Sequence, residues 1–114
     1  MKTKAMHDKA LWQSHIDRAS ELLAAMANPK RLSILCRLVD GEHSVGELTD
    51  ALGARQTTVS QHLALLKRAG FVEARRDAQT QYYSLAGQEV RSVLEALYSM
   101  YCSGKSAGRG AGPR

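Results

Sequence analysis

The sequence predicts a mainly α-helical (α+β) domain whose elements follow in the order α-α-α-α-β-β-α. Apolar residues recur at helical spacing in the predicted helices. Two short runs that contain β-branched and aromatic residues stand just before the last helix and are typical of strands. The chain of 114 residues has the length of one domain.

Asn28 and Pro29 separate the first two helices. Apolar side chains keep a helical stripe from residue 8 to residue 27. A residue before a proline is pushed out of the helical conformation, and a proline suits the first turn of a helix. The second helix is therefore expected to begin at Pro29 and to end near Gly41. Its apolar side is predicted to contain Leu32, Leu35, Cys36 and Val39.

A short third helix and a longer fourth helix are joined by a glycine turn. Ser44 and Glu47 match a capping box, which begins the third helix, and Gly53 ends it. The fourth helix runs from Gln56 to Gly70. Its apolar side is predicted to be Val59, Leu63, Leu66 and Ala69. Two helices joined in this way are typical of a helix-turn-helix.

The first turns of the fourth helix carry short side chains that form hydrogen bonds. A solvated helix more often carries Glu and Lys there, so this face favours contact with base edges and phosphates in a DNA major groove. An ordinary polar surface is the alternative. The candidate DNA-contacting residues of this face are Gln56, Thr57, Thr58, Ser60, Gln61 and His62. Arg55 stands at the N-cap position, where it cannot cap the helix but can reach a phosphate.

The strand-like runs 71–76 and 80–85 are joined by residues 77–79 and predict a β-hairpin. A hairpin directly after a reading helix, with arginines near its tip, is the wing of a winged helix-turn-helix. The residues expected to contact the DNA backbone are Arg55, Lys67, Arg68, Arg75, Arg76 and Gln79.

The first helix and the last helix (residues 88–102) carry more apolar surface than a small core can bury from one side. Such surplus predicts a homodimer formed through these two helices. Two copies would place their reading helices about 34 Å apart on palindromic DNA. The expected organisation is a flexible N-terminus at 1–7, the domain at 8–103, and a disordered basic tail at 104–114.

The net charge of +5 lies entirely in residues 55–114, which hold nine Lys and Arg against four Asp and Glu. A basic half that contains the polar helix favours a polyanionic partner. No segment is apolar enough to span a membrane, so a cytoplasmic protein is expected. An enzyme is not expected, because neither a glycine-rich phosphate loop nor a cysteine with a neighbouring histidine and carboxylate is present.

The chain resembles the ArsR family of winged-helix repressors over roughly residues 15–103. The resemblance is carried by the segments 27–32, 34–35, 44–48, 56–63, 65–72 and 82–85. It implies a homodimer that binds operator DNA and an inducer that weakens this binding. Many members of the family sense metals, but residues 45–50 contain no cysteine and residues 88–102 contain no histidine. Neither a metal site nor a cofactor is therefore expected.

Cys36 and Cys102 are the two cysteines. Chemistry alone leaves open whether they are inert buried thiols or a redox or metal site. Their positions are similar to those of the sulfide- and persulfide-responsive (SqrR/BigR-type) branch of the family. That resemblance implies that reactive sulfur species or oxidants join Cys36 to Cys102 by a disulfide or a polysulfide and so release the DNA. The alternatives are a metalloid inducer and a repressor without any thiol-based inducer.

Overall fold

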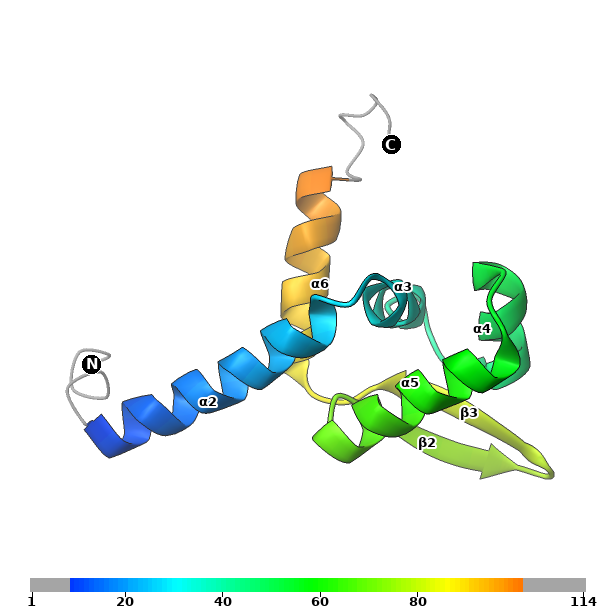
Figure 1. Ribbon diagram of the computed structural model, residues 1–114, viewed down its shortest axis with the longest axis horizontal. Helices are drawn as coiled ribbons and strands as arrows, with labels where there is room; N and C mark the ends of the chain where they lie inside the picture. The colour runs from blue at the N-terminus through cyan, green and yellow to red at the C-terminus, as the bar shows by residue number, and fades with distance from the viewer. Residues whose placement is uncertain (1–8, 102–114) are drawn as a thin grey trace.

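The computed structural model describes residues 9–101. Two long helices, α2 and α6, extend in different directions from a head that contains the other elements (Figure 1). In chain order the elements are α2 (Lys9–Met26), α3 (Pro29–Leu38), β1 (His43–Ser44), α4 (Val45–Leu52), α5 (Gln56–Ala69), β2 (Val72–Asp77), β3 (Thr80–Leu85) and α6 (Gln88–Tyr101). The predicted order is confirmed, with the short strand β1 in addition.

The helix ends follow from residues that satisfy exposed backbone groups. The Asn28 side chain accepts hydrogen bonds from the amides of residues 30 and 31 and begins α3. Ser44 and Glu47 form the predicted capping box at α4. Gly53 and Gly70 take the left-handed conformation after α4 and α5, with φ of 63° and 86°.

The three strands form one antiparallel sheet in the order β1-β3-β2. The wing is the hairpin of β2 and β3, whose pairing ends at Asp77 and Thr80. The turn therefore consists of Ala78 and Gln79, and the prediction of a three-residue connection from residue 77 is wrong. Ala78 has a φ of 60°, a conformation that is costly for an alanine.

The core lies where the last turns of α2, together with α3, α4 and α5, meet the hairpin and the first turns of α6. It consists of apolar side chains, and the structure buries no polar or charged residue between residues 9 and 101. The largest fully buried members are Phe71, Ile34, Leu35, Leu38, Leu48, Leu63, Leu66, Leu94, Val59 and Val90. The predicted apolar side of α5 is confirmed for Val59, Leu63 and Leu66, while Ala69 is half-buried.

The predicted apolar side of α3 is wrong at Cys36. The buried stripe of α3 is Ile34, Leu35 and Leu38, whereas Cys36 is exposed. Successive helical residues are turned by about 100°, so a stripe centred between residues 34 and 38 leaves position 36 on the far side. The interpretation of Cys36 as an inert core thiol is therefore excluded.

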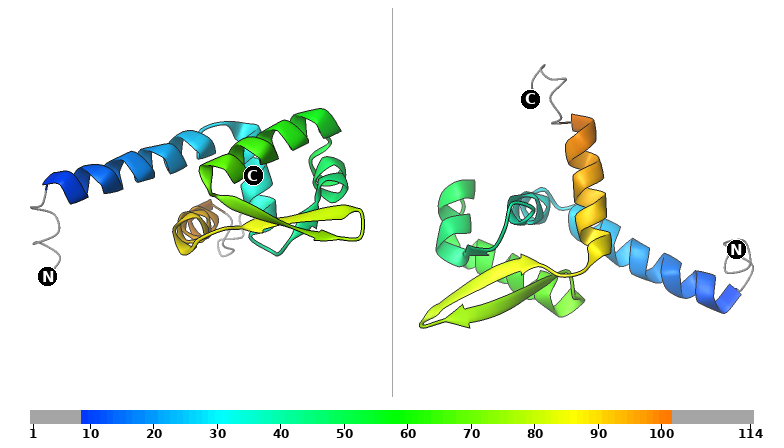
Figure 2. Two further views of the ribbon diagram at one scale, coloured as in Figure 1. Left: turned by 90° about the horizontal axis from the view of Figure 1, so that it is seen from below. Right: turned by 180° about the vertical axis from the view of Figure 1, so that it is seen from behind.

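The views from below and behind show α3 and α6 running crosswise to each other, beside the point where α2 ends (Figure 2). The predicted N-terminal segment 1–7, the tail 104–114 and Cys102 lie outside the described residues. Within the described part of the chain, no helix has both the length and the apolar character needed to cross a membrane.

Candidate nucleic-acid interface

Helix α5 presents a polar surface on a firmly packed base. Val59, Leu63 and Leu66 are buried beneath it and fix its position in the head. The candidate residues that point to solvent are Arg55, Gln56, Thr57, Ser60 and Gln61, while Thr58 and His62 are half-buried at the side of the helix facing α3. Arg55 makes no capping hydrogen bond, as its side chain predicts. The hydrogen-bonding groups of these exposed side chains point to solvent and do not pack in the core. They lie at the N-terminal end of α5, and in helix-turn-helix proteins this end of the second helix enters a DNA groove.

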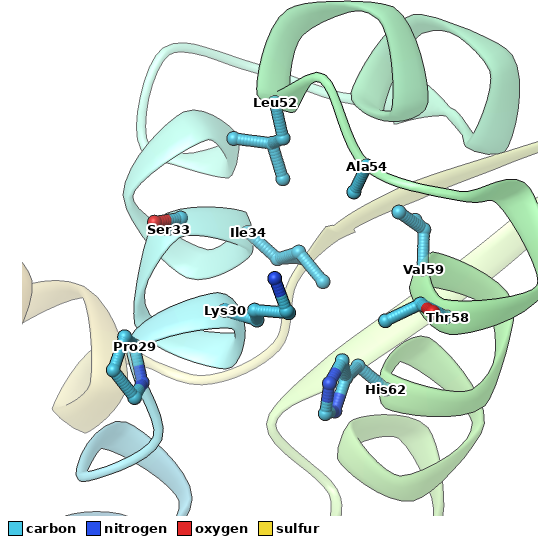
Figure 3. A pocket seen from close by; sticks show the side chains of 9 residues that line it. All are labelled: Pro29, Lys30, Ser33, Ile34, Leu52, Ala54, Thr58, Val59 and His62. Carbon is cyan, nitrogen blue, oxygen red and sulfur yellow. The ribbon is translucent and has the colours of Figure 1, made fainter.

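A cavity of about 240 Å³ separates the first turns of α3 from those of α5. Lys30 and His62 line it from the two helices (Figure 3). Partial burial, and then the charges of Arg31 and Lys30, lower the pKa of His62 below its ordinary value. Burial and the two neighbouring cations therefore favour the uncharged form of His62.

The wing carries two exposed arginines, of which Arg75 is paired with a carboxylate. Arg75 donates from Nε to Glu42 Oε1 at 2.9 Å, and its guanidinium lies 5.0 Å from the centre of the Tyr82 ring. The ion pair lowers the pKa of Glu42 and raises that of Arg75. This pair fastens the wing to the loop before β1. Arg76 is exposed closer to the wing tip and is the better placed of the two for a phosphate.

The remaining predicted backbone contacts are exposed at two separate places. Lys67 and Arg68 occupy the last turn of α5, and Gln79 lies in the wing turn. Exposed basic side chains therefore stand in the last turn of α5 and on the wing, in addition to the polar first turns of α5.

Arg18 joins both long helices to the carboxyl end of α5, a role that the sequence did not reveal. Its Nη1 atom donates to Ala69 O at 2.8 Å, and its Nε atom donates to Glu89 Oε2 at 3.3 Å. Its guanidinium also lies 4.3 Å from the centre of the Phe71 ring. From its place on α2, Arg18 therefore contacts both the end of α5 and the first turn of α6.

Large apolar side chains remain exposed along the two long helices. Tyr101 is 75% exposed and Leu23 is 61% exposed, and both lie on the helices for which the sequence predicted surplus apolar surface. The exposed members on these helices are Leu11, Trp12, Ile16 and Leu23 on α2, and Tyr98, Met100 and Tyr101 on α6. Their positions match the surfaces from which the sequence predicted a homodimer.

Cys36 lies on an exposed face near the carboxyl end of α3, and α6 starts close to that end. Arg91, in the first turn of α6, donates from Nη1 to Val39 O at 3.2 Å. Ten residues of helix, about 15 Å, separate Arg91 from Tyr101 at the other end of α6. Cys102 directly follows Tyr101, the last residue of α6. In residues 9–101, no three His, Cys, Asp or Glu side chains gather as a metal site would require.

The comparisons with known proteins agree with this geometry. Residues 28–74 match the family model described as "Bacterial regulatory protein, arsR family". The chain is 51% identical over 85 residues to the transcriptional activator HlyU of Vibrio cholerae, an alignment that spans 75% of this chain and 79% of HlyU. It is 45% identical over 89 residues to the biofilm growth-associated repressor of Agrobacterium fabrum, over 75% of this chain and 76% of that protein.

Solved structures show the same architecture. Reduced HlyU from Vibrio cholerae superposes with a TM-score of 0.76 at 47% identity, covering 80% of this chain and 96% of that chain. The transcriptional repressor BigR from Xylella fastidiosa gives a TM-score of 0.74 at 34% identity, with 84% and 98% covered. A structure from Mycobacterium bovis with a TM-score of 0.70 at 36% identity, covering 77% of this chain and 82% of that chain, is described as a homodimeric winged helix-turn-helix DNA-binding domain. The chain belongs to the ArsR family of winged helix-turn-helix transcriptional regulators, with BigR-type repressors among its close relatives.

Proposed function

We propose that this protein is a repressor that binds a palindromic operator as a homodimer, with one α5 helix in each of two successive major grooves. The observation that carries the proposal is the polar first half of α5, which stands exposed on a buried apolar base beside a basic wing. An α-helix of this kind fits a major groove, where base edges differ in their pattern of donors and acceptors.

The exposed side chains divide into two groups by their chemistry. Short amides and hydroxyls such as Gln61 and Thr57 can pair with base edges, and a Gln amide can pair with adenine through two hydrogen bonds. Cations such as Arg76 and Arg68 attract phosphates, which are the same at every sequence. The first group would determine which DNA sequence is bound, and the second would add affinity for DNA of any sequence.

Substitution of one member of each group is expected to give different results. Gln61→Ala should weaken binding to the operator by about 5- to 150-fold and leave non-specific DNA almost unaffected, because a base contact is worth about 1–3 kcal/mol. Arg76→Gln should weaken binding to both DNAs and lower the salt slope of log K by about one unit for each phosphate that the variant no longer binds. Fluorescence anisotropy across a salt series measures both quantities.

Gln13→Ala is the matched control, because Gln13 is exposed on α2, outside the proposed interface. It should leave both affinities unchanged. If Gln61→Ala reduced operator and non-specific binding equally, α5 would not be the element that reads the sequence.

We further propose that a sulfur link between Cys36 and Cys102 releases the operator. One property supports it: the Cys36 side chain is exposed, as attack on an oxidant requires. Arg91, in the first turn of α6, contacts the end of α3, and Cys102 follows the other end of α6, about 15 Å further along the helix. The link would therefore require α6 to move relative to α3, or would join Cys36 to the Cys102 of the second subunit. In forming a disulfide, the two thiols lose two electrons and two protons, and a polysulfide or peroxide accepts the electrons. Inserted sulfur atoms would relax the distance that a direct disulfide demands.

The sulfur link would change the angle between the head and the two helices of the proposed dimer surface, α2 and α6. Cys36 belongs to the head, whereas α6 belongs to the proposed dimer surface. Because Arg18 ties α2 and α6 to the end of α5, a rotation of α6 would shift α5 away from its half-site. Intact-mass measurement after polysulfide, peroxide and arsenite separates this inducer from a metalloid. Added sulfur or loss of two hydrogens supports the link, and bound arsenic without oxidation contradicts it.

A further inference from the structure

The cavity between α3 and α5 carries positive charge on one edge of the reading helix. Lys30 reaches from α3 and His62 from α5 toward the same gap (Figure 3). The hydroxyl-bearing residues Ser33 and Thr58 also line it. Gln61, which is exposed on the outer face of α5, immediately precedes His62 in the sequence, so the cavity borders the proposed DNA-reading surface.

Of the two cations near the cavity, Lys30 is the one whose side chain is available to bind a ligand. Arg31 is engaged, because its Nε atom donates to Ala25 O at 2.9 Å. The amides of residues 30 and 31 are also engaged, since both donate to Asn28 Oδ1. By contrast, Lys30 forms no ion pair with any residue from 9 to 101. A ligand here would therefore be bound by side chains and not by the helix terminus.

We propose that Lys30 and His62 together hold one phosphate of the operator backbone, at the edge of the groove that α5 enters. An anion suits the site because it would bring an opposite charge to a place where cations already crowd an imidazole. A DNA phosphodiester is the anion that reaches it when α5 lies in the groove. The inference rests on the proposed operator binding and adds Lys30, on α3, to the residues that bind DNA.

The site makes DNA binding depend on pH. The charges that act on His62 in the absence of DNA are those of Arg31 and Lys30, both on α3, and with burial they lower its pKa. A bound phosphate raises that pKa, so the complex takes up protons. The added affinity is complete below the pKa of the free protein and is lost as the pH rises through the pKa in the complex. Operator binding should therefore weaken between about pH 6 and pH 8.

Lys30→Gln tests the phosphate contact, and Arg37→Gln is its control. Arg37 is exposed on the same helix, two turns or about 10 Å further along, so the control removes an equal charge at a different place. Lys30→Gln should weaken binding to all DNA about three- to tenfold and lower the salt slope by about one unit per subunit. Arg37→Gln should keep the wild-type slope. Equal slopes in all three proteins would overturn the proposal.

His62→Gln tests the proton uptake. This variant should bind operator with an affinity that no longer depends on pH between about 6 and 8, the range in which a histidine titrates. NMR of the wild-type imidazole should show a higher pKa in the complex. An unchanged pKa, or an unchanged pH dependence in His62→Gln, contradicts the proposal. So does an equal shift with inorganic phosphate in place of DNA, because the site would then bind free anions. If the wild-type protein bound no DNA sequence specifically, the proposed function itself would fail.

Discussion

Treatment of the reduced protein with a polysulfide donor is expected to lower its operator affinity by about 10⁴-fold. A change of occupancy from 99% to 1% requires the linked state to disfavour binding by about 5.5 kcal/mol. A covalent bond between α3 and the end of α6 can supply this, because it is far stronger than a hydrogen bond such as the one from Arg91 to Val39 O. Anisotropy with one labelled operator, before and after treatment, measures the change.

The serine variants separate a link between two sulfurs from damage to one. Cys36→Ser and Cys102→Ser should both bind the operator like the reduced wild type, and polysulfide should not release either of them. Dithiothreitol should restore binding to the treated wild-type protein, since a disulfide or polysulfide is reducible. Release of either single variant by polysulfide would remove the pair from the mechanism.

A charge in the exposed apolar surface of α2 or α6 is expected to abolish tight operator binding. Trp12→Glu and Tyr98→Glu should each convert the proposed homodimer to a monomer, because a carboxylate buried at an apolar interface loses its hydration without gaining a partner. Both side chains are substantially exposed in the single chain, at 41% and 62%, so the fold of the protomer should survive. Without the second reading helix, operator affinity should fall about 10²- to 10⁴-fold.

Two further substitutions act as controls for the dimer surface. Gln13 and Ser99 are exposed residues that directly follow Trp12 and Tyr98 in the sequence, turned by about 100° around their helices. Gln13→Glu and Ser99→Glu add the same charge and should leave the dimer intact by sedimentation. Dimeric Trp12→Glu and Tyr98→Glu proteins with full operator affinity would show that the subunits meet elsewhere.

The sequence was sufficient to predict the helix ends that are determined by capping residues and glycines within the same short segment. Asn28 with Pro29, the capping box at Ser44, and the glycines at 53 and 70 placed the helix ends correctly, because each acts within a few residues of itself. The strand β1 could not be predicted, since His43 and Ser44 become a strand only by pairing with residues 82 and 83. A strand of two residues is too short to show the alternation of apolar and polar residues that identifies a strand in a sequence.

In the candidate site, too, features that depend on one helix were predicted from the sequence, and features that depend on contacts between distant residues were not. The exposed polar face of α5 followed from spacing, because three buried residues of one helix define its opposite side. The exposure of Cys36 did not, since α3 has apolar residues around much of its circumference and tertiary packing selects which stripe is buried. Arg18 was also missed, because its partners Ala69 and Glu89 are 51 and 71 residues away along the chain. Such contacts exist only after folding.

The claim on which the account depends is that α5 enters the major groove of the operator. An iron-EDTA cleavage reagent attached through Gln61→Cys, in a protein that also carries Cys36→Ser and Cys102→Ser, tests it directly. We expect two clusters of cleavage whose centres lie about 10 base pairs apart, one in each half-site, and none with the cysteine-free protein. Uniform cleavage, or no cleavage by a protein that still binds the operator, would contradict the claim.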